Sequence, residues 1–198
     1  MNFKNFVVLL TGASSGIGYQ LAKDLAMEGA KLALVARRTD ILKSLVDQIG
    51  DTSQIKYYKC DVTSKDEVYN TVKLIKEDFG QIDIAILNSG VSERLGVLNF
   101  NSSEAEITFN TNVLGPVYFI EELLPYFIKQ KKGYIVGVSS LADVKGFPKS
   151  GFYAASKAAL TILLESLRIE LKKYNVKVIT VKPGFVKTAM TDKNEFEM

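Results

Sequence analysis

Phe6-Val7-Val8-Leu9-Leu10-Thr11-Gly12-Ala13-Ser14-Ser15-Gly16-Ile17-Gly18 is the stretch of sequence on which the fold depends. Its first five residues form a short continuous apolar run, which is typical of a strand buried on both faces. A glycine-rich turn follows, and a helix then begins with Ile17, Leu21 and Leu25 on one stripe. Glycines at such a corner permit a tight turn and close approach of a pyrophosphate, which the helix N-terminus favours. The stretch therefore predicts a phosphate-binding corner.

The spacing of this corner is G-x-x-x-G-x-G, so it does not meet the general G-x-G-x-x-G fingerprint of dinucleotide-binding proteins. Its position between a strand and a helix is the context that such a motif requires. The candidate cofactor-binding residues here are Gly12, Ser14, Ser15, Gly16, Ile17 and Gly18.

Apolar runs and helical patterns alternate along the rest of the chain. This alternation is typical of βαβ units, and it predicts an α/β fold with a doubly wound parallel sheet, at least six strands and helices on both faces. We expect strands at residues 5–11, 31–36, 55–60, 83–88, 133–139 and 177–182. We expect helices near 41–49, 68–79, 103–130 and 151–173. No repeat, low-complexity tract or linker interrupts residues 1–198, which predicts a single domain.

Composition excludes several classes of function. The chain has 198 residues, and its formal net charge of +3 is too slight and dispersed to indicate nucleic-acid binding. Cys60 is the only cysteine and there is no histidine, so we expect no disulfide and no metal site. No segment approaches the length of a membrane span, and the first apolar run is too short for a secretory signal. These features predict a cytoplasmic protein that does not bind membranes.

Asn101-Ser102-Ser103 matches a glycosylation acceptor, but Ser103 with Glu106 also forms a capping box before an apolar-periodic stretch. Because no secretion signal is present, we expect Ser103 to cap a helix.

Tyr153-Ala154-Ala155-Ser156-Lys157 begins a stretch of helical period near the other end of the chain. Residues four apart share a helix face, so the phenol and the ammonium are expected to be neighbours. A free phenol has a pKa of about 10, and a nearby cation favours its ionised form. Lys157 is thus expected to bring the pKa of Tyr153 towards working pH. Taken alone, the pair also fits two ordinary neighbours on a helix surface.

Several further motifs occur in a fixed order: Thr11 to Gly18, Asp61-Val62, Asn88-Ser89-Gly90, Asn112, Ser140, Tyr153 to Lys157, and Pro183 to Thr188. Together they resemble the short-chain dehydrogenase/reductase family, and the resemblance covers nearly the full length. One departure is mild, since the family most often has Asn-Ala-Gly or Asn-Asn-Gly where this chain has Asn88-Ser89-Gly90. The resemblance implies a single-domain Rossmann oxidoreductase.

The resemblance also implies four catalytic residues: Asn112, Ser140, Tyr153 and Lys157. Tyr153 would exchange a proton with the substrate oxygen while hydride passes between nicotinamide and carbon. Ser140 would hydrogen-bond the same oxygen. Lys157 would bind the nicotinamide ribose, and Asn112 would hold a water linking Lys157 to solvent. Singly, each of these residues also fits a local structural role.

The residues after the second strand decide the expected cofactor. NAD-preferring Rossmann proteins place an acidic residue there, whereas this chain has Ala36 followed by Arg37 and Arg38. A guanidinium matches a phosphate, so we expect NADP(H) to be preferred over NAD(H), with Arg37 as the main ligand, and Arg38 and Ser14 as helpers.

By resemblance, other positions complete the cofactor site. Asp61 and Val62 would lie by the adenine, and Asn88, Ser89 and Gly90 beside the adenosine. Tyr153 and Lys157 would also contact the cofactor, while Pro183, Gly184, Val186 and Thr188 would close the nicotinamide side.

The expected function is an NADP(H)-dependent oxidoreductase acting on a small carbonyl or alcohol. The alternative is a catalytically silent NADP-binding regulator on the same fold. Substrate-wall candidates are Leu141, Ala142, Phe147, Phe185 and Met190. The helices at 103–130 and 151–173 resemble the faces through which family members pair, which implies a homodimer or homotetramer.

The C-terminal region is shorter than the family pattern, which usually continues with a lid, a helix and a last strand. Either the chain is a short natural form, or the sequence omits a segment. We favour the second, because Asp192 to Glu195 is a polar stretch suited to a mobile lid.

Overall fold

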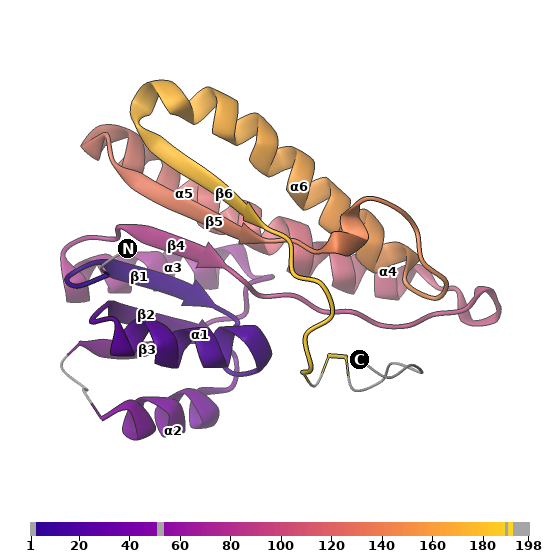
Figure 1. Ribbon diagram of the computed structural model, residues 1–198, viewed down its shortest axis with the longest axis horizontal. Coiled ribbons are helices and arrows are strands. Elements are labelled where there is room, and N and C mark those ends of the chain that lie inside the picture. The colour runs from indigo at the N-terminus through magenta and orange to yellow at the C-terminus, as the bar shows by residue number, and fades with distance from the viewer. Residues whose placement is uncertain (1–2, 51–53, 189, 192–198) are drawn as a thin grey trace.

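The computed structural model describes residues 3–50, 54–188 and 190–191, and a six-stranded sheet forms its centre (Figure 1). All neighbouring strands are parallel, in the order β3-β2-β1-β4-β5-β6. The strands are β1 (Val7–Thr11), β2 (Lys31–Ala36), β3 (Ile55–Lys59), β4 (Ile84–Leu87), β5 (Gly133–Val138) and β6 (Val176–Val181). The predicted doubly wound sheet is confirmed, and it places its topological switch between β1 and β4.

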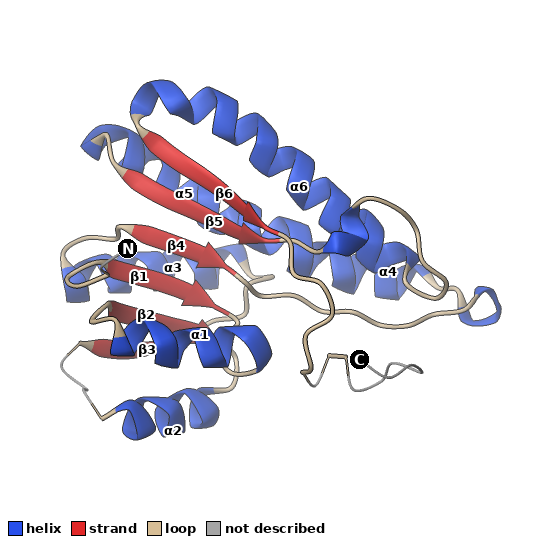
Figure 2. Ribbon diagram, in the orientation of Figure 1, coloured by secondary structure: helices blue, strands red, loops and turns tan. Residues whose placement is uncertain are grey.

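Helices cover both faces of the sheet (Figure 2). One face carries α1 (Gly16–Met27) and α2 (Thr39–Ile49), and the other carries α3 (Lys65–Phe79), α5 (Gly115–Gln130) and α6 (Gly151–Leu171). Strand β1 is buried along its whole length, which explains its continuous apolar run. Val8 and Leu10 pack in the core cluster with α1 and α2, and Leu9 packs in the opposite cluster. Burial of such side chains contributes about 1.5–3 kcal/mol each.

The helix expected at 103–130 is interrupted. The structure has α4 (Ser102–Phe109), a π-helical turn at Asn110–Leu114, and then α5. The backbone N–H of Gly115 donates to the carbonyl oxygen of Asn110, five residues earlier, so the turn holds one extra residue. Such single π turns occur frequently at functional sites, and this one contains Asn112.

The expected cap of this helix was wrong by two residues. Asn101, not Ser103, is the N-cap, and its side chain accepts a hydrogen bond from the Glu104 backbone N–H. Asn101 and Glu104 also have the three-residue spacing of a capping box, and the side-chain amide oxygen satisfies one of the free donors of the first turn. Ser103 lies inside the helix.

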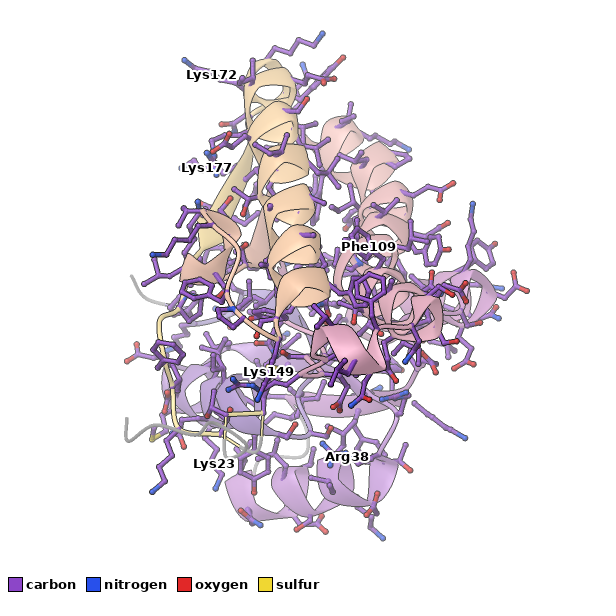
Figure 3. All side chains as sticks on the ribbon, turned by 90° about the vertical axis from the view of Figure 1, so that its right-hand side faces the viewer. Lys23, Arg38, Phe109, Lys149, Lys172 and Lys177 are labelled. Carbon is purple, nitrogen blue, oxygen red and sulfur yellow. The ribbon has the colours of Figure 1, made fainter. Side chains whose placement is uncertain are left out.

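The two ends of the sheet carry different groups. In Figure 3, Lys172 and Lys177 lie at one end of the molecule and Arg38, which follows the carboxyl end of β2, lies at the other. Within the described ranges, no helix combines the length and the apolar character of a membrane span. The polar stretch from Asp192 to Glu195 lies outside the described residues.

Candidate active site

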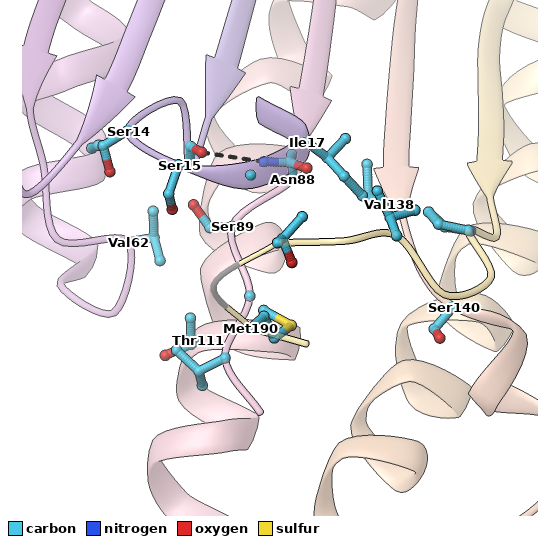
Figure 4. Close-up of a pocket in the computed structure, with 18 of the residues that line it drawn as sticks. Ser14, Ser15, Ile17, Val62, Asn88, Ser89, Thr111, Val138, Ser140 and Met190 are labelled. Carbon is cyan, nitrogen blue, oxygen red and sulfur yellow. Dashed lines mark hydrogen bonds between the residues drawn. The ribbon is translucent and has the colours of Figure 1, made fainter. Parts of the chain in front are cut away.

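A cavity of about 510 Å³ opens at the carboxyl ends of the strands (Figure 4). All the predicted site residues line it except Gly18 and Asn112. Those that line it are Gly12, Ser14, Ser15, Gly16, Ile17, Arg37, Arg38, Asp61, Val62, Asn88, Ser89, Gly90, Ser140, Tyr153, Lys157, Pro183, Gly184, Val186 and Thr188. Residues far apart in the sequence therefore meet at one edge of the sheet, where open α/β folds bind ligands.

The glycine-rich turn is tied to the end of β4. The Thr11 hydroxyl oxygen accepts hydrogen bonds from the backbone N–H groups of Asn88 at 2.9 Å and Ser89 at 3.1 Å. The Asn88 side-chain amide in turn donates to the carbonyl oxygens of Thr11 and Gly12 (Figure 4). Thr11 was not predicted as a site residue. Its position as the last residue of a buried strand was the available signal, because a hydroxyl there needs a partner.

Gly18 supports the turn by packing. A Cβ atom on Gly18 would overlap the carbonyl oxygen of Gly12 and lie 2.6 Å from Nδ2 of Asn88. Gly12 itself has φ of 67°, a left-handed conformation that glycine adopts without strain. The first helix can therefore approach β1 and β4 closely, although Gly18 does not reach the cavity.

The two arginines after β2 take different directions. Arg38 donates from NH2 to the Ser14 hydroxyl at 3.0 Å and to the Ser14 carbonyl oxygen at 3.4 Å. The Arg37 guanidinium lies 3.7 Å from the Asp61 carboxylate, and its side chain is 69% exposed. We expected Arg37 to be the residue at the phosphate position, but the structure places Arg38 against the glycine-rich turn. Adjacent residues at a strand end point to opposite sides, which explains the difference.

Asp61 is held at the end of β3 by local contacts. Its Oδ1 accepts hydrogen bonds from the backbone N–H of Thr63 at 3.0 Å and from the Thr63 hydroxyl at 2.8 Å. Burial alone would raise the pKa of Asp61, but these bonds and the charge of Arg37 outweigh it, so the pKa lies below its usual value. A carboxylate therefore faces this end of the cavity.

Ser140 and Lys157 bracket Tyr153 at the opposite end. The Ser140 side chain hydrogen-bonds the Tyr153 phenol, and Nζ of Lys157 lies 5.8 Å from the centre of the phenol ring. Ser140 follows β5, and the other two residues lie one turn apart at the start of α6. The structure thus brings together the groups that the Tyr153 to Lys157 spacing predicted as neighbours.

The effect that we expected of Lys157 on Tyr153 is not what the structure shows. Burial raises the pKa of Tyr153 above its usual value, and the hydrogen bond from Ser140 only partly opposes this. Lys157 is buried and donates from Nζ to the Val138 carbonyl oxygen at 2.8 Å. Its own pKa falls from 10.5 to about 8, because burial disfavours the ammonium. The ammonium is directed at a backbone carbonyl rather than at the phenol oxygen.

Asn112 lies beneath the cavity and is fully buried. Its Oδ1 accepts a hydrogen bond from the backbone N–H of Val91 at 2.8 Å. Its Nδ2 donates to the Val91 carbonyl oxygen at 2.9 Å and to the Ser156 hydroxyl at 3.0 Å. Asn112 therefore joins the segment after β4 to α6. A Cβ on Gly90 would lie 3.4 Å from both Oδ1 of Asn112 and Nζ of Lys157, so these two groups flank Gly90.

The segment after β6 closes the cavity. The carbonyl oxygen of Pro183 accepts a hydrogen bond from the Leu141 backbone N–H at 3.0 Å. Thr188 lies against the glycine-rich turn, since a Cβ on Gly16 would be 3.2 Å from its methyl carbon. The C-terminal segment thus runs from the Ser140 loop back to the pyrophosphate corner.

Of the expected substrate walls, only Met190 lines the cavity. Leu141 and Phe185 are mainly exposed, and Ala142 is not among the lining residues. Phe147 lines a separate hollow of about 210 Å³ with Phe100 and Phe152. The expectation for these four residues was wrong because sequence proximity to Ser140 or Pro183 does not fix the side to which a loop residue turns. Lining residues that we had not predicted include Val91, Thr111, Val138, Ser139 and Thr191.

A metal does not enter this picture. In the part of the chain that the structure describes, no group of three or more cysteine, aspartate or glutamate side chains is arranged to hold a metal ion.

Comparison with known proteins gives a consistent result. The family model described as short chain dehydrogenase matches residues 6–197. An uncharacterized oxidoreductase of Staphylococcus epidermidis is 32% identical over 193 residues, which are 98% of this chain and 83% of the relative.

Solved structures are similar over the same extent. A short chain dehydrogenase/reductase from Burkholderia phymatum in complex with NAD has a TM-score of 0.91 and 26% identity, and the match covers 100% of this chain and 75% of that one. An alcohol dehydrogenase from Thermococcus sibiricus complexed with 5-hydroxy-NADP has a TM-score of 0.89 and 25% identity, covering 98% and 83% of the two chains.

Proposed function

The chain belongs to the short chain dehydrogenase family of NAD(P)-dependent oxidoreductases, and from this premise we propose that it interconverts a carbonyl and an alcohol with NADP(H) and with Tyr153 as the general acid and base. One observation supports the proposal above all others. The Ser140 hydroxyl, the Tyr153 phenol and the Lys157 ammonium converge in the cavity that the glycine-rich turn opens.

The residues of the cavity fit a dinucleotide. The left-handed Gly12 and the packed Gly18 leave the backbone of the turn free of side chains, so a pyrophosphate can approach the start of α1. Asp61 and Asn88 to Gly90 would hold the adenosine, and Lys157 would bind the nicotinamide ribose. Pro183, Gly184, Val186 and Thr188 would cover the ring. When bound, the nicotinamide supplies or accepts the hydride.

The side chains then handle the proton and the developing charge. In the reductive direction, Tyr153 donates its phenolic proton to the substrate oxygen, and Ser140 donates a hydrogen bond to the same atom. A tyrosine whose pKa is raised by burial holds its proton at neutral pH, which suits the acid role. Asn112 fixes the floor of the site by joining the Gly90 segment to α6.

Arg38 supports the preference for NADP(H). Two of its hydrogen bonds reach the Ser14 hydroxyl, so a guanidinium and a hydroxyl converge beside the glycine-rich turn. A 2′-phosphate at this place would gain charge-assisted hydrogen bonds from Arg38. Ala36 offers no carboxylate to bind a ribose 2′-hydroxyl or to repel a phosphate. Arg37 would act next to Asp61 on the adenine side.

An oxidation assay with NADPH tests this function. The enzyme would be mixed with NADPH or NADH and a panel of ketones and aldehydes, and the loss of reduced nucleotide followed. Tyr153→Phe removes only the proton donor, so its turnover should fall by roughly 10²- to 10⁴-fold. Tyr134→Phe is a matched control, because Lys177 lies 5.3 Å above the Tyr134 ring but neither residue lines the cavity. Undiminished turnover by Tyr153→Phe would exclude the acid role, whereas NADPH binding without turnover of any substrate would favour the silent regulator.

We also infer that the protein acts on a small molecule as a homodimer or homotetramer. Ile162 and Ile169 lie seven residues apart on α6 and are 64% and 78% exposed. Both positions share a helix face, and their pairing with another chain would remove apolar surface from water. The expected cytoplasmic location stays a prediction.

A further inference from the structure

Asp143 is a buried carboxylate directly behind the proposed catalytic groups. It ends the short 3₁₀ turn Leu141–Asp143, three residues after Ser140, and its side chain is 1% exposed. Oδ2 accepts a hydrogen bond from the Thr161 hydroxyl at 2.6 Å and lies 2.8 Å from Nζ of Lys182. Oδ1 is buried and has no hydrogen-bond partner among the described residues. A carboxylate in such a place is costly, so its presence requires an explanation.

The partners of Asp143 come from each segment that carries a proposed catalytic or cofactor residue. Thr161 lies one helical turn after Lys157 on α6, and Lys182 precedes Pro183 after β6. Ser139, next to Ser140, has its hydroxyl 2.7 Å from that of Thr161 and 3.0 Å from the Lys157 carbonyl oxygen. One carboxylate therefore links the Ser140 turn, α6 and the end of β6.

The two hydroxyls of this cluster offer two hydrogens for three close contacts. A carboxylate at Asp143 can only accept, so Thr161 donates to Asp143 and Ser139 donates to Thr161. The Lys182 ammonium keeps Asp143 ionised: burial alone would raise the pKa of Asp143, but the hydrogen bonds from Lys182 and Thr161 hold it below its usual value. The cluster thus has one direction of donation and one geometry.

This geometry bears on Ser140. Its hydroxyl oxygen accepts a hydrogen bond from the Ala142 backbone N–H at 3.1 Å, which occupies one lone pair. The hydroxyl hydrogen then remains available for the Tyr153 phenol oxygen or for a substrate oxygen. Because the Ala142 N–H belongs to the short turn that Asp143 anchors, the direction of the Ser140 hydroxyl depends on the anchor.

We propose that Asp143 is a positioning residue that fixes the Ser140 turn on α6 and so aims the Ser140 hydroxyl at Tyr153. The proposal rests on the function proposed above for Ser140 and Tyr153. Asp143 itself does not line the cavity, so it acts through Ser140 and not on the substrate. Thr161 and Lys182 are the two groups that hold it in place.

The test is a titration of Tyr153 that needs no substrate. Tyrosinate absorbance would be followed against pH in wild type and Asp143→Asn, each compared with the same chain carrying Tyr153→Phe, so that the difference reports Tyr153 alone. We expect the Tyr153 midpoint to move to higher pH in Asp143→Asn, because the Ser140 hydrogen bond that lowers it is weakened. Loss of the negative charge by itself would move the midpoint to lower pH. An unchanged midpoint or a shift to lower pH, in a folded variant, would overturn the proposal.

Kinetics and a matched variant complete the test. With a ketone that wild type reduces, Asp143→Asn should lose roughly 10- to 100-fold in kcat with a smaller change in KM, as expected for a misplaced donor. Asp78→Asn is the control, since Asp78 also pairs with a lysine at 2.6 Å and a tyrosine hydroxyl at 2.6 Å but lies on α3, away from the cavity. It should leave the midpoint and kcat unchanged. If Asp143→Asn does not fold, Thr161→Val decides by the same titration. If wild type reduces no ketone, the proposed function fails, and the titration still judges Asp143.

Discussion

The Lys157 ammonium donates a hydrogen bond to the Val138 carbonyl oxygen at 2.8 Å while it lies 5.8 Å from the centre of the Tyr153 ring. The lysine is thus held at the end of β5 by the backbone, next to the phenol but not bonded to it. Because Lys157 is buried, its charged form is disfavoured in the folded protein. The same position that suits a ribose hydroxyl therefore costs stability when the site is empty of ligand.

This cost predicts a pH dependence of stability. Native Lys157 loses its proton near pH 8, whereas in the unfolded chain it does so near 10.5. Between these values the unfolded chain binds more protons, so the free energy of unfolding should rise with pH. The shift from 10.5 to about 8 corresponds to about 3 kcal/mol at about 1.4 kcal/mol per pKa unit. Urea unfolding of wild type and Lys157→Met at several pH values gives the difference; a difference that is constant from pH 7 to 10.5 would contradict the burial effect.

The Arg38 contact with Ser14 predicts which arginine selects the nucleotide. Arg38→Ala should weaken NADPH binding by about 1–3 kcal/mol, the range for a lost charged hydrogen bond, and should leave NADH binding nearly unchanged. Arg37→Ala is the matched neighbour and should have the smaller effect, because its side chain is 69% exposed and lies by Asp61. Calorimetric titration of both nucleotides measures these affinities. A larger effect of Arg37→Ala would return the phosphate to the originally expected residue.

The sheet could be predicted from the sequence because burial on both faces leaves a direct mark. The apolar run at 6–10 and the helical stripe of Ile17, Leu21 and Leu25 each reflect the packing of one element. The spacing of Tyr153 and Lys157 likewise follows from the period of α6. Such local patterns are sufficient where each residue's environment depends mainly on its own element.

Other features depend on contacts between distant elements, and the sequence did not reveal them. The π turn around Asn112 adds one residue to a helix whose apolar pattern continues across it, and the Asn112 amide is fixed by Val91 and Ser156. Asp143 resembles any turn residue in the sequence, because its partners Thr161 and Lys182 are 18 residues or more away. The direction of Arg38 was hidden for the same reason.

The close packing of Gly18 predicts a large effect from one methyl group. In Gly18→Ala the new Cβ would overlap the Gly12 carbonyl oxygen and lie 2.6 Å from Nδ2 of Asn88, so the turn must move. We expect a loss of about 1–3 kcal/mol in the free energy of unfolding, measured in urea. Gly96→Ala is the control, since no other atom lies within 4 Å of a Cβ there and its φ is −77°. It should change stability by less than about 0.5 kcal/mol. Equal effects of the two substitutions would mean that the corner is looser than its distances indicate.

The exposed isoleucines of α6 predict an assembly that one charge can break. If Ile162 and Ile169 pack against a second chain, each would contribute about 1.5–3 kcal/mol by burial, and Ile169→Glu would place a carboxylate in that apolar contact. Light scattering at micromolar concentration should show a dimer or tetramer for wild type and a monomer for Ile169→Glu. Met27 on α1 is 79% exposed, against 78% for Ile169, but lies on the opposite face of the sheet, so Met27→Glu should keep the assembly. A monomeric wild type, or an assembly that survives Ile169→Glu, would show that this face of α6 does not join two chains.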